Sequence, residues 1–75
     1  MMRSQKLAFH GFENGFFKFK ADNGKVIAFK KANKELIEKY ALLSNQSIGA
    51  WFSAKYFIDP VLDNDIYILC DLDLG

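Results

Sequence analysis

The pattern of hydrophobic and polar residues changes character at Lys31. Before it, two polar turns separate three segments rich in hydrophobic side chains, which are residues 7–12, 16–21 and 25–30. Asn14-Gly15 marks the first turn, because both central residues of a type I′ hairpin turn need a positive φ. Asp22-Asn23-Gly24 marks the second turn, with the glycine at a left-handed position. These signals predict a meander of three strands.

Residues 33–43 follow the period of a helix, with one apolar side made of Leu36, Ile37, Tyr40, Ala41 and Leu43. Asn33 is a suitable N-cap, because its side chain can accept a hydrogen bond from a free backbone N–H. Glu35 near the start and Lys39 near the end both suit the helix dipole. So short a helix is unstable alone, and we expect it to dock on the sheet.

Two further strands follow the predicted helix. Residues 47–58 alternate without a break, and the predicted inner face is Ile48, Ala50, Phe52, Ala54, Tyr56 and Ile58. Asp59-Pro60 ends this strand. The last strand, residues 66–74, also alternates, and its predicted inner face is Ile66, Ile68, Cys70, Leu72 and Leu74. Tyr67 is then expected on the outer face.

The order of three strands, a short helix and two strands predicts an all-β fold with one short helix. At this length, the order resembles the OB-fold, a five-stranded Greek-key β-barrel. The resemblance is one of topology, and it covers residues 1–75 as one domain. A closed barrel would also protect the long hydrophobic strand edges of a flat sheet. An SH3-like barrel, which usually lacks a helix at this position, and an open α+β sheet are the alternatives.

Charge is unevenly distributed along the chain. The 75 residues are 51% hydrophobic and carry a net charge of +1, as in an ordinary folded protein. Residues 1–55 hold all ten Lys and Arg but only four acids, which is a local charge of +6, whereas residues 56–75 hold five Asp and no base. This asymmetry predicts a basic face and an acidic rim. The pI of 7.8 is lower than that of most dedicated nucleic-acid binders, which is above about 9.

Lysines and aromatic residues interleave along the second, third and fourth predicted strands. In OB-fold proteins that bind single strands, outward aromatic rings stack on bases while basic side chains follow the phosphates. The predicted interface with single-stranded nucleic acid consists of Phe16, Lys18, Lys20, Lys30, Trp51, Lys55 and Phe57. The alternative is a protein-interaction or homo-oligomerisation module, in which the same aromatic residues meet a partner or a second subunit.

The sequence gives little indication of a catalytic or metal-binding site. His10 is the only histidine and Cys70 the only cysteine, so neither a catalytic dyad nor a metal site is indicated. The acidic loop lacks the ordered spacing of a calcium loop; its carboxylates are Asp59, Asp63 and Asp65. No apolar run approaches the ~18 residues of a membrane span, and no signal peptide is evident. We therefore expect a cytoplasmic binding protein that is not an enzyme, with no cofactor, metal or membrane contact.

Overall fold

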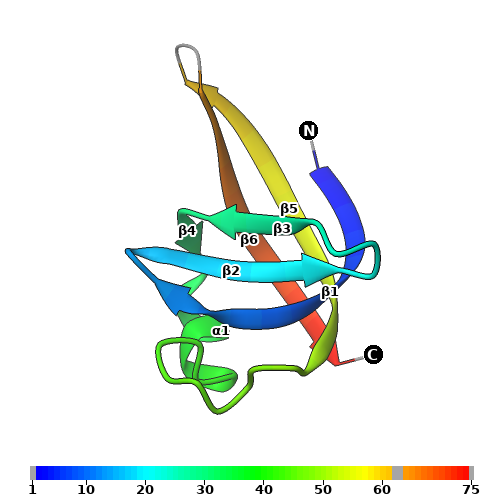
Figure 1. Ribbon diagram of the computed structural model, residues 1–75. Helices are drawn as coiled ribbons and strands as arrows, with labels where there is room; N and C mark the ends of the chain where they lie inside the picture. The colour runs from blue at the N-terminus through cyan, green and yellow to red at the C-terminus, as the bar shows by residue number, and fades with distance from the viewer. Residues whose placement is uncertain (1, 62–63, 75) are drawn as a thin grey trace.

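A computed structural model of the protein describes residues 2–61 and 64–74. The elements in chain order are β1 (Met2–Glu13), β2 (Phe16–Ala21), β3 (Val26–Phe29), β4 (Lys31–Ala32), α1 (Lys34–Lys39), β5 (Trp51–Val61) and β6 (Asn64–Leu74). The strands form one sheet in the order β3-β2-β1-β5-β6-β4, and this sheet curls around the core (Figure 1). Its two outermost members, β3 and β4, are separated in sequence only by Lys30. The chain therefore joins the two ends of the curled sheet at Lys30, and the sheet forms a half-barrel.

The predicted all-β fold with one short helix is confirmed, but the predicted number of five strands is wrong. The described residues form six strands, because the chain bends at Lys30 and then forms β4. At the bend, the N–H of Lys30 donates to the carbonyl oxygen of Tyr67 over 3.0 Å. β4 then pairs in parallel with β6, with Lys31 opposite Ile68. The extra strand is thus the continuation of the third predicted strand.

The core is made largely of aromatic rings. In β2, Phe17 and Phe19 are buried, whereas Phe16 and Lys20 are exposed, as the alternation predicted. Three ring centroids lie 5.1, 5.5 and 6.3 Å from that of Phe19, and they belong to Phe9, Phe29 and Phe52. β5 has the predicted inner face over its first half, where the buried residues are Phe52, Ala54 and Tyr56.

Both predicted turns are present. Asn14 has a φ of 53° and Gly15 a φ of 82°, which is the conformation of a type I′ turn. Gly24 has a φ of 89°, and its N–H donates to the carbonyl oxygen of Ala21 over 3.0 Å. β1, β2 and β3 pair in antiparallel order, so the predicted meander is confirmed.

The helix is shorter than predicted. Asn33 caps it by accepting a hydrogen bond from the N–H of Glu35, but the helix ends at Lys39 because Ala41 adopts a φ of 50°. The chain then continues in turns, and β5 begins only at Trp51. For this reason Ile48, predicted on an inner strand face, lies before the strand and is 49% exposed.

A β-bulge in β6 changes which of its residues face the core. Lys55 of β5 is opposite Asp71, but the next residue, Tyr56, is opposite Leu69. Cys70 is therefore left without a partner, and the alternation shifts by one residue. Leu69 and Leu72 are both buried as a result. The predicted inner face is right at Leu72 and at Leu74, which is opposite the buried Phe52 but 69% exposed near the end of the strand. Tyr67, expected on the outer face, packs partly buried against the core, and Cys70 is half-buried.

Candidate nucleic-acid interface

The outer surface of the sheet brings Trp51 and Lys20 to the two sides of a small residue, Ala8. Lys20 of β2 is directly opposite Ala8 of β1, and Ala8 is directly opposite Trp51 of β5. The three residues thus form one row across the sheet. Because neighbouring strands lie about 4.8 Å apart, the backbones of Lys20 and Trp51 are separated by about 10 Å. The row thus combines an aromatic ring with a cation.

A hollow opens above this row. It has a volume of about 420 Å³, and its lining residues are Ala8, Lys20, Ala21, Asp22, Asn23, Gly24 and Trp51. The small side chain of Ala8 keeps the floor of the hollow low between its larger neighbours. The Trp51 side chain is 42% exposed and forms one wall. The indole ring is therefore accessible from the hollow.

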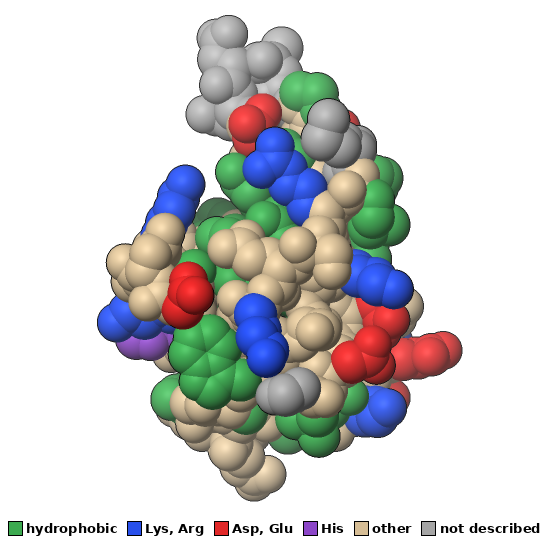
Figure 2. Space-filling model, turned by 90° about the vertical axis from the view of Figure 1, so that its right-hand side faces the viewer, with side chains coloured by type: hydrophobic (Ala, Val, Ile, Leu, Met, Phe, Trp, Pro, Cys, Tyr) green, Lys and Arg blue, Asp and Glu red, His purple; other side chains and the backbone are tan. Residues whose placement is uncertain are grey.

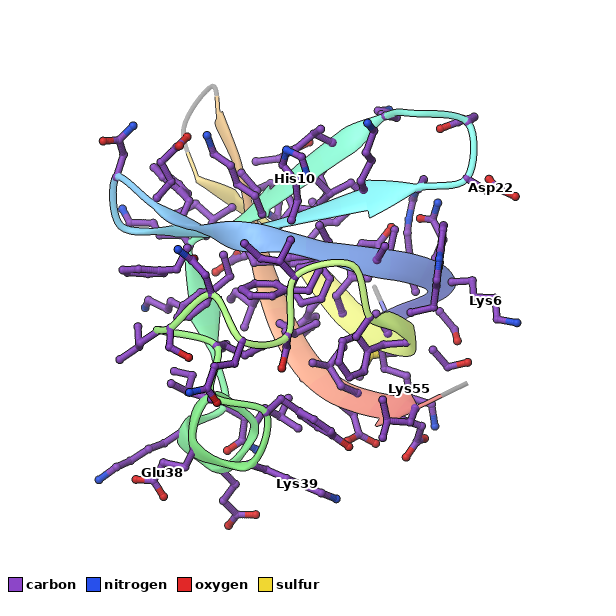
Figure 3. All side chains as sticks on the ribbon, turned by 60° about the horizontal axis from the view of Figure 1, so that its bottom comes forward. Lys6, His10, Asp22, Glu38, Lys39 and Lys55 are labelled. Carbon is purple, nitrogen blue, oxygen red and sulfur yellow. The ribbon has the colours of Figure 1, made fainter. Side chains whose placement is uncertain are left out.

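Two more lysines extend the basic surface along the strands. Lys6 of β1 is opposite Ser53, and Lys55 of β5 is opposite Ser4, so both lie on the outer face that carries Ala8 and Trp51. Figure 3 shows Lys6 and Lys55 on the same side of the molecule, with Lys6 pointing away from the sheet. We call Lys6, Lys20 and Lys55 the basic stripe.

Lys6 is not among the residues that the sequence pattern predicts for the interface. The first strand was expected to begin at Leu7, whereas β1 begins at Met2. A period-two pattern starting before Leu7 would have indicated Lys6, but the segment 2–6 contains mostly polar residues and gives no alternation.

An acidic border lies beside the basic stripe. Asp71 of β6 is opposite Lys55, and Asp73 is opposite Ser53. Figure 2 shows the side of the molecule that carries the β2–β3 turn in Figure 1, where one group of acidic side chains lies at the right-hand border and others lie on the left-hand side and near the top. The carboxylates of Asp71 and Asp73 limit the basic surface on the β6 side.

Lys18, another predicted site residue, is already engaged by a carboxylate. Its Nζ lies 2.5 Å from Oε1 of Glu13, and this is the single ion pair within residues 2–61 and 64–74. The hydrogen bond from Lys18, followed by its positive charge, lowers the pKa of Glu13. The charge of Lys18 is thus partly neutralised, whereas no such pair involves the lysines of the basic stripe in the described residues.

The structure divides the predicted site into three groups. Lys20, Trp51 and Lys55 lie together on the face described above. Phe16 and Lys18 are at the opposite end of β2, near Lys30, which follows β3. Phe57 is in an apolar row, because it is opposite Met2 on one side and Ile68 on the other. The first group combines the most exposed of these three rings, Trp51, with two lysines that form no ion pair within the described residues.

The remaining candidate residues form no site of their own. His10 is exposed at an irregularity of β1, where the register shifts between Phe9 and Gly11. Asp59 and Asp65 are exposed, and Asp63 lies outside the described residues. Over the described part of the chain, no three His, Cys, Asp or Glu side chains gather closely enough to hold a metal ion. Within the same residues, no helix has the length and hydrophobicity that crossing a membrane requires.

Comparisons of the chain with protein-family models, with curated proteins and with solved structures found no match.

Proposed function

We propose that this protein binds single-stranded nucleic acid on the outer face of β1, β2 and β5, and that its sheet is an OB-like barrel. Counting β3 and β4 as one interrupted strand leaves five strands, in which the third runs parallel to the last. A partly open five-stranded Greek-key barrel of this kind is the OB-fold, which commonly binds oligonucleotides. Because the same fold has many other functions, the proposal is based on the residues of the interface.

The observation that carries the proposal is the position of Trp51 beside the basic stripe. Its indole is accessible, it borders a hollow of about 420 Å³, and Lys20 lies across that hollow. Stacking of a base on an aromatic ring contributes about 1–3 kcal/mol and tolerates any base. Lysines on both sides can follow the phosphates of the same strand. We therefore expect binding with little sequence preference and a strong dependence on salt.

A fluorescence titration tests the proposal directly, because Trp51 is the only tryptophan. A mixed-sequence single-stranded 15-mer is added at a salt concentration of about 20 mM, and saturable quenching is expected. The affinity of Trp51→Ala is then measured by the anisotropy of a labelled oligonucleotide. We expect this variant to remain folded and to lose about 1–3 kcal/mol of binding free energy, because the stacking surface is gone.

Phe57→Ala is the matched control. Phe57 is 37% exposed, is on the same strand and the same face as Trp51, and lies outside the basic stripe. We expect this variant to bind like the wild type. A folded Trp51→Ala protein with unchanged affinity would contradict the stacking role. If the wild type does not bind at low salt, and light scattering shows a dimer, the homo-oligomerisation module is the better explanation.

A further inference from the structure

A groove separates β3 from the strands that face it. β3 is at one end of the sheet and pairs only with β2 in the described residues. Its other edge borders a groove of about 530 Å³, whose opposite side includes Arg3, Tyr56, Asp65 and Tyr67. β3 and β6 come together where the N–H of Lys30 donates to the carbonyl oxygen of Tyr67. Away from that point the β5–β6 hairpin rises past β3 and diverges from it (Figure 1).

The register shows which backbone groups of β3 face this groove. The N–H of Ala21 donates to the carbonyl oxygen of Lys25, so these two residues are a hydrogen-bonded pair of the antiparallel ladder. Bonded and non-bonded pairs alternate, which makes Ile27 and Phe29 the next bonded residues. The N–H and C=O groups of Val26 and Ala28 therefore point away from β2. The bond from Lys30 to Tyr67 confirms this alternation, since Lys30 is the next residue of that set.

On the other side of the groove, the edge of β6 is occupied from Tyr67 onward and free at Asp65 among the described residues. The carbonyl oxygens of Tyr67 and Leu69 accept hydrogen bonds from Lys30 and Asn33. Asp65 precedes Tyr67 by two residues, so its backbone groups point to the same side. The groove thus has unpaired strand edges on both sides among the described residues.

The chemistry of the groove favours an extended peptide over a nucleic-acid strand. Val26 and Ala28 offer donors and acceptors that repeat every second residue, about 6.8 Å apart, and only another extended polypeptide carries the matching groups at that spacing. Arg3 and Lys25 contribute two positive charges to the groove, and Asp65 contributes one negative charge. We propose that the groove binds an extended acidic segment of a partner protein, which pairs with the free edge of β3 as an added strand. This inference does not depend on the proposed nucleic-acid function.

A second copy of the chain suits this edge less well. β3 has only four residues, and lysines flank it on both sides, at Lys25 and Lys30. Two copies pairing through β3 would bring these like charges together. Short edge strands flanked by lysine are a common protection against such self-association.

Amide exchange and NMR titration of the full chain test the proposal. In the free protein, the amides of Val26 and Ala28 should exchange quickly, whereas those of Ile27 and Phe29 should be protected by β2. The probe is a blocked nine-residue peptide of alternating threonine and glutamate. We expect it to shift the Val26 and Ala28 resonances and to slow their exchange at least tenfold. A peptide of alternating threonine and lysine should bind at least tenfold more weakly.

Two variants separate backbone pairing from charge. Ala28→Pro removes a donor that faces the groove and no bond to β2, so peptide affinity should fall at least tenfold while the rest of the spectrum is preserved. Arg3→Glu tests the charge if Ala28→Pro does not fold. This second variant should shift the preference from the glutamate peptide toward the lysine peptide, and Lys34→Glu on α1 should not.

Three results would overturn the proposal. The first is the absence of any saturable shift at Val26 and Ala28 with the glutamate peptide. The second is a shift of these amides with protein concentration alone, which would indicate a second copy as the occupant. The third is a response of these amides to a single-stranded oligonucleotide in place of the peptide.

Discussion

At the scale of single residues, Gly15 shows how one backbone angle fixes the β1–β2 hairpin. Its φ is 82°, and a Cβ atom added there would have no other atom within 4 Å. A substitution is thus unfavourable only because of backbone strain. We expect Gly15→Val to lower the free energy of unfolding by about 1–3 kcal/mol in chemical denaturation. Gly15→Asn is the control and should lose less, because asparagine tolerates this conformation. Equal stability of the valine variant would contradict the strain argument.

Phe52 shows how much the packing of a single core residue contributes to stability. Its side chain is fully buried, and its ring centroid lies 6.3 Å from that of Phe19 and 5.0 Å from that of Tyr40. Phe52→Ala should cost about 3–5 kcal/mol, because it leaves a cavity among these rings. That is a large part of the stability of a domain this small. Phe57→Ala, on the outer face of the same strand, should cost less than about 1 kcal/mol. A Phe52→Ala protein that melts within a few degrees of the wild type would contradict the assigned core.

At the scale of the elements, the sequence correctly predicted the strands and turns that depend only on neighbouring residues. The alternation at Phe17 and Phe19 and the turn at Asn14-Gly15 specify the first hairpin within a dozen residues. The predicted inner face of β6 is wrong before the bulge, which leaves Cys70 without a partner and shifts the alternation by one residue. A bulge depends on the neighbouring strand, and residues 66–70 are apolar on both faces and so fit either register. The helix was likewise too long in the prediction, because the left-handed Ala41 has no signal of its own.

The bulge can be tested by comparing two adjacent residues of β6. Leu69 is 1% exposed, whereas Ile68 is on the outer face and is only partly buried. Leu69→Ala should therefore lower the free energy of unfolding by about 2–5 kcal/mol. Ile68→Ala should cost clearly less, since its side chain leaves no enclosed cavity. Without the bulge, the uninterrupted alternation from Leu72 would bury Ile68 and expose Leu69, and the two effects would be reversed.

At the scale of the whole molecule, the interface depends on pairing between distant parts of the chain. Lys20 and Trp51 are 31 positions apart in the sequence, and they share a row only because β1 lies between β2 and β5. The sequence predicted both residues from their types and faces, but it could not predict that Phe16 and Phe57 would lie elsewhere. The order of the strands in the sheet decides which residues become neighbours. The period of hydrophobic residues along one strand does not indicate which strands lie beside it.

Because β1 and β2 are neighbours, Lys6 and Lys20 are expected to act together on one bound strand. If a single strand crosses the basic stripe, Lys6 and Lys20 each neutralise a phosphate and release a counterion. Lys6→Ala and Lys20→Ala should then each flatten the slope of log affinity against log salt by about 0.7, and the double variant by about twice that amount. The slope is measured by oligonucleotide anisotropy between about 20 and 200 mM salt. Lys34→Ala, which removes an exposed lysine on α1 far along the chain from these strands, should leave the slope unchanged. Equal slopes in Lys6→Ala, Lys20→Ala and Lys34→Ala would show that charge attracts the strand without a defined path, whereas an additive loss confined to the stripe would place the phosphates along β1 and β2.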